Sequence, residues 1–539
     1  MKKFVTILMC AIIALCCFSC GDDSGTEGND GTKITIFAGG SSEFKWPSGS
    51  KEAEVIEAIE DKYYQDKGIK LDFVINNTLG QSMKSHIVTD VNEGKIDVII
   101  SHTGGGDGID DWAMDMNIYY DLDTLMQQYL ADYIDEGLFL WDDGDGLEID
   151  ALKRMTTVGR EVIGIPSVIN PYKFGILVRK DWMLQAGYTD DKTDTARTYV
   201  GDFETFTAMA EKMISQQNLK DGAIGGAIFD VEKAGVLGAN GVNAGYYSNT
   251  LYAEDEKNYV GPGYIHPDYA KVLETEHSWS QKGILAADPD KIMLEEGEAN
   301  FVAGKTGIFL QDPTVTHLIE VARRCKKENP EAEFTVLGAL TKTPESTDKG
   351  FMRNSVAAFS AVIPKNSPNA KLVMQFLRWM YESKENYLLC KYGREGIDWI
   401  YDEEKQTYDY PENSGNSIYN PPYSGILALV ENQNMADLTY AGYTDEERSW
   451  IRTAREKQNY IVNDTVDYLL YSNNKENRDK KGTAAVNISS GYIRPYWSGT
   501  KNGNLLPISN YYPSARAAFM TGAQGFMTDL YNAYLTLKG

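Results

Sequence analysis

The sequence predicts an α/β fold with mainly parallel sheets, divided into more than one lobe. Residues 33–100 alternate between strand-like and helix-like segments, and a second series of the same kind begins near residue 165. Such alternation is typical of a parallel sheet with helices on its faces. The length of 539 residues exceeds the usual size of one domain, so we expect at least two lobes.

The first series has the order β-α-β-α-β. Residues 33–38 and 69–75 alternate apolar and polar side chains, which predicts strands. Residues 51–66 and 79–91 repeat apolar side chains at helical spacing, and a glycine follows each segment within a few residues. Residues 96–100 are almost wholly apolar, which predicts a strand buried on both faces. In sheets of this kind, ligands bind beyond the carboxyl ends of the strands.

The second series is less regular, and the chain beyond about residue 400 is rich in Tyr, Asn and Asp with scattered helical patterns. The strand-like runs are 172–178, 223–229, 301–310 and 356–363, and helices are expected to open at 179–182 and to span 369–382.

The N-terminus resembles the lipobox of bacterial lipoproteins. A positively charged start, the apolar run 4–18 and Ser19 precede Cys20, and the polar stretch 21–31 follows it. The family usually has Leu where this chain has Cys17. The resemblance implies that residues 1–19 are a signal peptide, that Cys20 carries lipid, and that residues 20–32 are a flexible tether. The protein would then be exported and anchored at the extracellular or periplasmic face of a bacterial membrane, although an ordinary secretory signal is an open alternative.

Composition excludes some partners. A net charge of −26 makes nucleic acid an unfavourable partner, and no apolar run after residue 20 reaches membrane-spanning length. Cys325 and Cys390 lie in helix-like segments, so two free buried thiols are favoured over a disulfide. The 34 Tyr and 9 Trp suit both core packing and sugar-binding surfaces.

The sequence matches none of the common motifs for catalysis, metal binding or nucleotide binding that we considered. Residues 141–148 have a calcium-like composition without EF-hand spacing, which favours a solvated turn and leaves calcium binding open. Residues 104–106 lack the Lys-Ser/Thr of a phosphate-binding loop, and neither Gly-x-Ser-x-Gly nor His-Glu-x-x-His occurs. We therefore expect no catalytic residue, no metal site and no cofactor.

Five stretches, in this order, resemble the extracellular solute-binding proteins of ABC importers, specifically the large sugar-binding family. The most specific is the closing pattern Gly-x-Glu-Gly-x-Asp-aromatic at 393–399. Together the stretches cover roughly residues 20–400. They are Cys20 with its tether, 33–39, 165–182, 301–307 and 363–399.

The resemblance implies a fold like type 2 periplasmic-binding proteins, with two discontinuous lobes, each a mixed, mainly parallel sheet flanked by helices, joined by a hinge. The expected division is 33–168 with about 300–350 in lobe 1, and 169–299 with about 351–440 in lobe 2. Residues 441–539 are expected to form a C-terminal helical extension packed on the lobes. A carbohydrate would bind between the lobes, and ABC permease subunits would recognise the closed monomer.

The candidate ligand-binding residues follow expected strands or lie at the expected crossover between lobes. Trp46 could stack on the apolar face of a sugar, and carboxylates accept hydrogen bonds from vicinal hydroxyls. A purely structural role stays open for each residue, and a lone His102 is a poor metal ligand. The candidates are Ser41, Glu43, Trp46, Ser101, His102, Asp107, Trp112, Asn170, Tyr172, Tyr247, Asp312, Arg353 and Asn354.

The leading functional prediction is a receptor without enzymatic activity that delivers an oligosaccharide to an ABC permease. Three alternatives stay open: a surface glycan-binding lipoprotein of an outer-membrane uptake system, a lipoprotein glycoside hydrolase, and a peptide-binding receptor. The first alternative is mainly helical, which the alternation in residues 33–100 disfavours.

Overall fold

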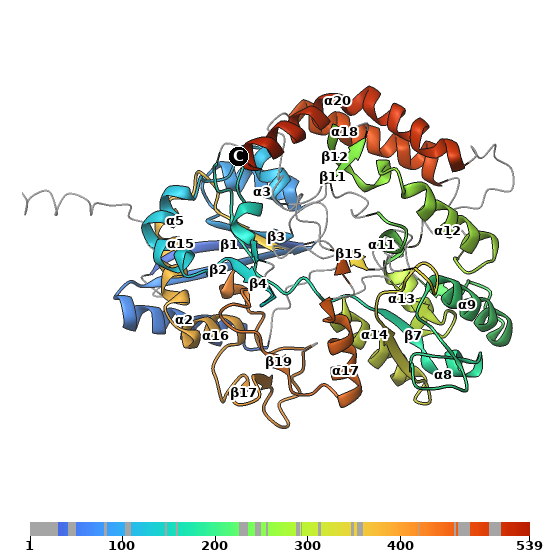
Figure 1. Ribbon diagram of the computed structural model, residues 1–539. Helices are drawn as coiled ribbons and strands as arrows, with labels where there is room; N and C mark the ends of the chain where they lie inside the picture. The colour runs from blue at the N-terminus through green and yellow to red at the C-terminus, as the bar shows by residue number, and fades with distance from the viewer. Residues whose placement is uncertain are drawn as a thin grey trace, which may run out of the picture.

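The structure is a computed structural model with two α/β lobes side by side and a pair of long helices across one end (Figure 1). It describes residues 31–40, 50–79, 83–102, 109–145, 148–157, 160–225, 235–242, 249–254, 257–286, 292, 294–310, 314–346, 350–352, 359–418, 420–457, 460–461, 475–494 and 508–538.

Lobe 1 is built on a five-stranded sheet with the order β2-β1-β3-β16-β6. The strand β1 is parallel to both β2 and β3, and β16 runs antiparallel to both of its neighbours, β3 and β6. The strands are β1 (Thr32–Gly40), β2 (Leu71–Leu79), β3 (Val98–His102), β6 (Ile165–Pro166) and β16 (Phe359–Val362).

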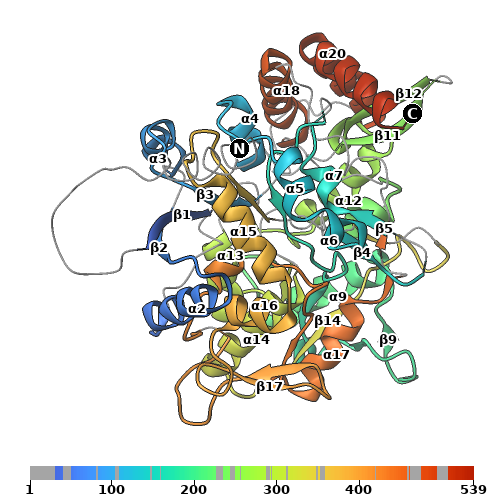
Figure 2. The same cartoon turned by 90° about the vertical axis from the view of Figure 1, so that its left-hand side faces the viewer.

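The predicted β-α-β-α-β opening is confirmed. Helix α2 (Glu52–Lys67) connects β1 to β2, and α3 (Met83–Asn92) connects β2 to β3. The strand β3 is buried on both faces, because Val98 and Ile100 belong to one apolar cluster and Ile99 belongs to another. The amphipathic helix α15 (Ala370–Tyr381) covers the sheet face that carries Ile34 and Phe73 (Figure 2).

Lobe 2 is built on a four-stranded sheet with the order β10-β13-β7-β14. Its strands are β7 (Ile176–Arg179), β10 (Ile224–Gly225), β13 (Ile308–Phe309) and β14 (Phe334–Leu337), and its helices include α8 (Lys180–Gln185), α9 (Phe203–Gln217), α12 (Tyr269–Gln281), α13 (Leu294–Val302) and α14 (Val315–Glu328).

The strand pairing corrects the expected division of the chain. Both β13 and β14 pair with β7, so residues 300–350 build the sheet of lobe 2 rather than lobe 1. Conversely β16 lies between β3 and β6, which places this strand, and the helix α15 that follows it, in lobe 1. The prediction was also wrong in taking 301–310 as one strand, because α13 ends at Val302 and a turn precedes β13. A short apolar run does not distinguish a buried helix end from a strand.

The remaining elements are short apart from the C-terminal helices. Those up to residue 265 are α4 (Ile109–Asp115), α5 (Asp123–Tyr129), α6 (Ala131–Asp135), β4 (Leu140–Asp142), β5 (Glu148–Asp150), α7 (Ala151–Arg154), β8 (Tyr188–Thr189), β9 (Thr198–Tyr199), α11 (Leu237–Ala239), β11 (Asn249–Glu254), β12 (Lys257–Pro262) and the 3-10 turn η2 (Gly263–Ile265). Those beyond residue 350 are β15 (Phe351–Met352), α16 (Lys384–Tyr392), β17 (Ile400–Asp402), β18 (Thr407–Asp409), η3 (Ile426–Ala428), β19 (Thr439–Tyr440), α17 (Asp445–Ala454), β20 (Tyr460–Ile461), α18 (Lys475–Ile488), the π turn η5 (Ser489–Ile493), η6 (Ile508–Asn510) and α20 (Tyr511–Lys538).

The C-terminal helices α18 and α20 pack on each other, and α20 also packs on β12, η2 and α12 (Figures 1 and 2). The hydroxyl of Tyr511 donates to the carbonyl of Tyr264 over 2.8 Å, and Phe519 contacts the Tyr264 ring. No helix in the described part of the chain is long and apolar enough to cross a membrane. Cys325 and Cys390 are both buried and free.

Candidate functional site: the junction between the lobes

The carboxyl ends of the parallel strands in lobe 1 lie at the edge of the sheet from which the chain leaves for lobe 2. The strands β1 and β3 end there at Gly40 and His102. Because β16 is antiparallel, its first residue, Phe359, pairs with His102, and the next residue, Ser360, pairs with Pro166. The chain therefore leaves lobe 1 from the edge at which α/β sheets bind ligands.

Lobe 2 receives the chain at the corresponding edge of its own sheet. The strand β7 starts at Ile176, which pairs with Leu337 at the carboxyl end of β14. The strand β13 is antiparallel to β7, so it also ends at this edge. Residues 167–175 thus connect the carboxyl edges of both sheets, and the space between the lobes is where a ligand would meet both.

Between the described elements the chain passes from one lobe to the other three times, and the first crossing is hydrogen-bonded to the chain that leads to the third. The crossings are residues 167–175, the segment between β15 and β16, and the segment between β19 and α17. Val168 donates to the carbonyl of Glu431 and accepts from the N–H of Gln433, both over 2.8 Å. The side chain of Gln433 accepts the N–H of Asn170 over 2.5 Å. These bonds fix the first crossing against the chain that leads to the third.

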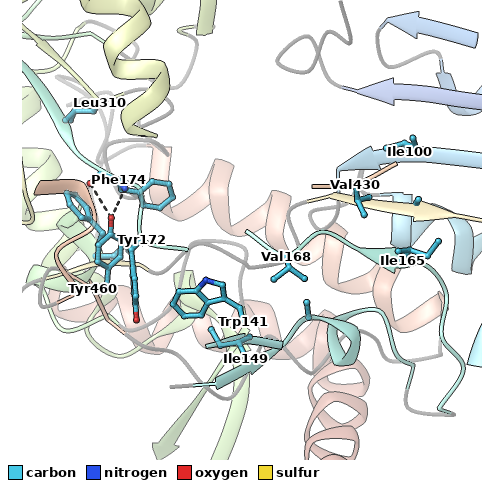
Figure 3. Packing of buried hydrophobic residues seen from close by; sticks show 14 of the residues in the cluster. Ile100, Trp141, Ile149, Ile165, Val168, Tyr172, Phe174, Leu310, Val430 and Tyr460 are labelled. Atoms are coloured by element: carbon cyan, nitrogen blue, oxygen red, sulfur yellow. Dashed lines mark hydrogen bonds between the residues drawn. The ribbon is translucent and has the colours of Figure 1, made fainter. Parts of the chain in front are cut away.

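An aromatic cluster lies where the crossings meet (Figure 3). The ring of Tyr172 lies between Trp141 and Tyr460, with ring centroids 5.4 Å and 4.9 Å apart. Tyr460 also contacts Phe351 at 5.6 Å, and Phe351 contacts Phe174 at 6.3 Å. Trp141 comes from lobe 1, and the other rings come from the crossings or from strands beside them, so the cluster is the core of the hinge.

The turn between β4 and β5 binds the ammonium group of Lys457, which follows α17 in the chain. Two local hydrogen bonds stabilise the turn. The side chain of Asp142 accepts the N–H of Gly144, and the side chain of Asp143 accepts the N–H of Asp145, each over 2.7 Å. Lys457 places its Nζ 2.6 Å from Oδ2 of Asp145, and this hydrogen bond raises the pKa of Lys457. The predicted solvated turn holds for Asp145, which is 74% exposed, but the Asp143 side chain is only 6% exposed. No group of three or more acidic, His or Cys side chains in the described part of the chain could hold a metal ion.

Most of the candidate ligand-binding residues fall outside the described part of the chain, so their roles stay predictions. They are Ser41, Glu43, Trp46, Asp107, Tyr247, Asp312, Arg353 and Asn354, and the proposed lipidation site Cys20 also lies outside.

The described candidates occupy different environments. Ser101 is buried in β3, and His102 ends that strand, at the edge facing lobe 2. Trp112 is buried in α4 with the second apolar cluster of lobe 1. Asn170 is half-buried and accepts the N–H of Tyr172 over 2.8 Å. Tyr172 is only 4% exposed, so in this conformation its ring contacts the hinge and has little surface for a ligand.

Sequence reasoning missed the hinge residues Trp141, Lys457 and Tyr460. No local motif marks them, because their partners lie up to 314 residues away in the chain. The one available signal was the Asp-rich composition of residues 141–148.

Solved structures with the same two-lobe architecture match nearly the whole chain. An HMO-binding ABC-transporter-associated solute-binding protein from Bifidobacterium longum infantis matches with a TM-score of 0.62 at 12% identity, over 94% of this chain and 99% of that chain. The N-glycan transport solute-binding protein NgtS from Streptococcus pneumoniae matches with a TM-score of 0.61 at 14% identity, over 94% and 99%. The substrate-binding protein FusA of an S. pneumoniae ABC transporter, solved with kestose, matches with a TM-score of 0.60 at 14% identity, over 94% and 99%.

No protein-family model matches the sequence, and no curated protein matches it. At these identities the structural likeness establishes the fold. The chain has the two-lobe fold of ABC-transporter solute-binding proteins, as the sequence resemblance implied.

Proposed function

We propose that this protein is the substrate-binding component of an ABC importer and captures a carbohydrate, specifically an oligosaccharide, between its two lobes. The observation that carries the proposal is the likeness over 94% of the chain to solute-binding proteins whose names specify HMO, N-glycan and kestose ligands. The facing carboxyl edges of the two sheets support the same location for the ligand.

Capture works by hinge closure. A ligand that contacts both lobes binds the closed arrangement better than the open one, and this difference in affinity drives closure. The half-buried Asn170 lies on the first crossing, where its side chain could reach a sugar hydroxyl. The aromatic platform would come from Trp46, and carboxylates such as Asp107 would accept vicinal hydroxyls. The protein needs no catalytic group for ligand capture. The permease subunits would recognise the closed form.

Export and anchoring belong to the same proposal. Cys20 would carry lipid, and residues 20–32 would tether a monomeric receptor to the outer face of the cell membrane. Metabolic labelling of the expressed chain with a fatty-acid probe tests this. We expect label on the native protein and none on Cys20→Ser. Label on both would show that the lipid is attached to another residue.

Calorimetric titration tests the ligand class. The purified protein would be titrated with neutral oligosaccharides, the matching monosaccharides and short basic peptides, which the acidic surface would favour in a peptide receptor. We expect saturable binding of one oligosaccharide class and weaker binding of its monosaccharides. Binding of peptides alone would replace the carbohydrate proposal by a peptide receptor of the same fold.

A further inference from the structure

A single lysine connects a hairpin of lobe 1 to the part of the chain that is packed on lobe 2. The Nζ of Lys457 lies 2.6 Å from Oδ2 of Asp145 and 3.6 Å from Oδ2 of Asp143. The same ammonium also donates to the main-chain carbonyl of Asp143. The lysine therefore makes three polar contacts with one turn.

The hairpin that carries this turn belongs to lobe 1. The side chain of Asn434 donates to the carbonyls of Leu138 and Leu140, at the start of the hairpin, over 3.1 Å and 2.8 Å. The buried side chain of Asn432 donates to the same Leu138 carbonyl over 3.0 Å. The helix α7, which follows the hairpin, packs against β6 of the lobe 1 sheet. These contacts fix the position of the turn relative to lobe 1.

The segment that carries the lysine is fixed to lobe 2. The helix α17 ends three residues before Lys457 and packs against α14 and β14. Glu447 in this helix accepts two hydrogen bonds from Arg323 of α14, each over 2.6 Å. Trp450 and Ala454 are buried in the apolar cluster of lobe 2. Movement of lobe 2 relative to lobe 1 would therefore change the distance between Lys457 and the turn.

The contacts are unequal in burial, which determines how they respond to solvent. The Asp143 carboxylate is 6% exposed, and besides the ammonium it faces the hydroxyl of Tyr172 at 3.5 Å. Separation of the lysine would remove an ion-pair partner from this buried carboxylate, which is unfavourable. Asp145 is 74% exposed, so its attraction to the lysine is screened by salt.

We propose that Lys457 is a positioning residue that holds the two lobes in one relative orientation through Asp143 and Asp145. For a receptor that closes on its ligand, this contact biases the equilibrium between lobe arrangements and so changes ligand affinity. That consequence rests on the proposed function, whereas the effect on lobe orientation does not.

Single-molecule energy transfer between the lobes tests the orientation directly, without any ligand. Dyes would be attached through encoded azide residues at the exposed positions of Glu57 in α2 and Gln216 in α9, in the full chain. The test variant is Lys457→Met, which keeps the apolar stem and removes the charge. The control is Lys405→Met, because Lys405 makes a 2.6 Å pair with Asp402 inside one hairpin, three residues away.

We expect Lys457→Met to broaden or shift the distribution of interlobe distances at low salt, and high salt to move the wild type toward the variant. Lys405→Met should match the wild type at every salt concentration. An unchanged distribution in Lys457→Met at low and high salt would overturn the proposal.

Asp145→Asn provides a second variant, because its exposed side chain can change without disturbing the core. It should change the distances in the same direction as Lys457→Met, and a wild-type distribution would contradict the inference. Once a sugar ligand is identified, its dissociation constant should change by about 2- to 5-fold in Lys457→Met and stay unchanged in Lys405→Met. Absence of any sugar binding would defeat the proposed function and leave the distance measurement valid.

Discussion

The hydroxyl of Tyr460 accepts a hydrogen bond from the main-chain N–H of Phe174 over 2.7 Å, across 286 residues of sequence. The same hydroxyl donates to the carbonyl of Ala454 over 2.6 Å, at the end of α17. Both partners are buried, and burial raises the pKa of the Tyr460 phenol, so it stays protonated at physiological pH. One side chain thus joins the first crossing of the hinge to the end of α17.

Removal of this hydroxyl should destabilise the protein. Tyr460→Phe leaves the N–H of Phe174 buried without its acceptor, so we expect a loss of about 1–3 kcal/mol in the free energy of unfolding. Chemical denaturation measures it. Tyr64→Phe is the control, because Tyr64 is 53% exposed, and it should change stability by less than about 0.5 kcal/mol. Equal stability of both variants would show that the Tyr460 hydroxyl does not hold the crossings.

Acid should weaken the attachment of α17 to lobe 2. Burial raises the pKa of Glu447, but the hydrogen bonds from Arg323 outweigh it and hold the pKa below its ordinary value of 4.5. A lowered carboxyl pKa stabilises the folded state above the unfolded pKa, and this stability is lost as the pH falls through the folded pKa. We therefore expect stability to fall as the pH drops below about 4.5, and to fall less in Glu447→Gln.

At neutral pH Glu447→Gln should itself cost about 1–3 kcal/mol, because Arg323 loses its charged acceptor. The pH series of urea midpoints measures both effects. Asp402→Asn removes an exposed pair as a control and should leave the neutral-pH midpoint unchanged. An equal fall of the urea midpoint below pH 4.5 in the wild type and in Glu447→Gln would contradict a lowered pKa of Glu447 in the folded protein.

The entry into lobe 2 requires a glycine. A Cβ at Gly175 would overlap Cγ1 of Val336, the neighbouring side chain on β14. Gly175→Ala should therefore destabilise the protein by about 1–3 kcal/mol, as overpacking does. At Gly491 a Cβ would meet no atom within 4 Å, so Gly491→Ala is the matched control. A melting temperature of Gly175→Ala equal to that of Gly491→Ala would show that β14 moves aside freely.

The ligand platform proposed at Trp46 can be tested by affinity. Trp46→Ala should weaken oligosaccharide binding by about 1 kcal/mol or more, while Trp46→Tyr, which keeps a stacking ring, should weaken it less. Titration against the best sugar ligand gives both values. An alanine variant within about 0.5 kcal/mol of the wild type would remove Trp46 from the site.

Local patterns predicted the elements well and the division of the chain poorly. The helix expected at 369–382 is α15 (Ala370–Tyr381), because its apolar residues repeat at helical spacing and pack on one sheet face. Such patterns could not predict which sheet β13 and β16 would join, because their pairing partners lie 130 to 263 residues away in the chain.

The hinge was predictable only in part. Residues 165–182 were identified as the crossover, but the environment of Tyr172 depends on Trp141 and Tyr460, which no spacing connects to it. The closing pattern at 393–399 proved to be structural in the described chain. Asp398 is fully buried against Arg394, and Trp399 donates to the carbonyl of Gly393 over 2.9 Å.

Capture of an intact oligosaccharide can be measured by a thermal-shift experiment followed by chromatography of the recovered sugar. At a hundred times its dissociation constant, a ligand should stabilise the folded state by about 2.7 kcal/mol. We predict a saturable rise in melting temperature with the sugar recovered at its original length. A rise accompanied by shortened sugar would identify a glycoside hydrolase, and no rise with any sugar would contradict a carbohydrate receptor.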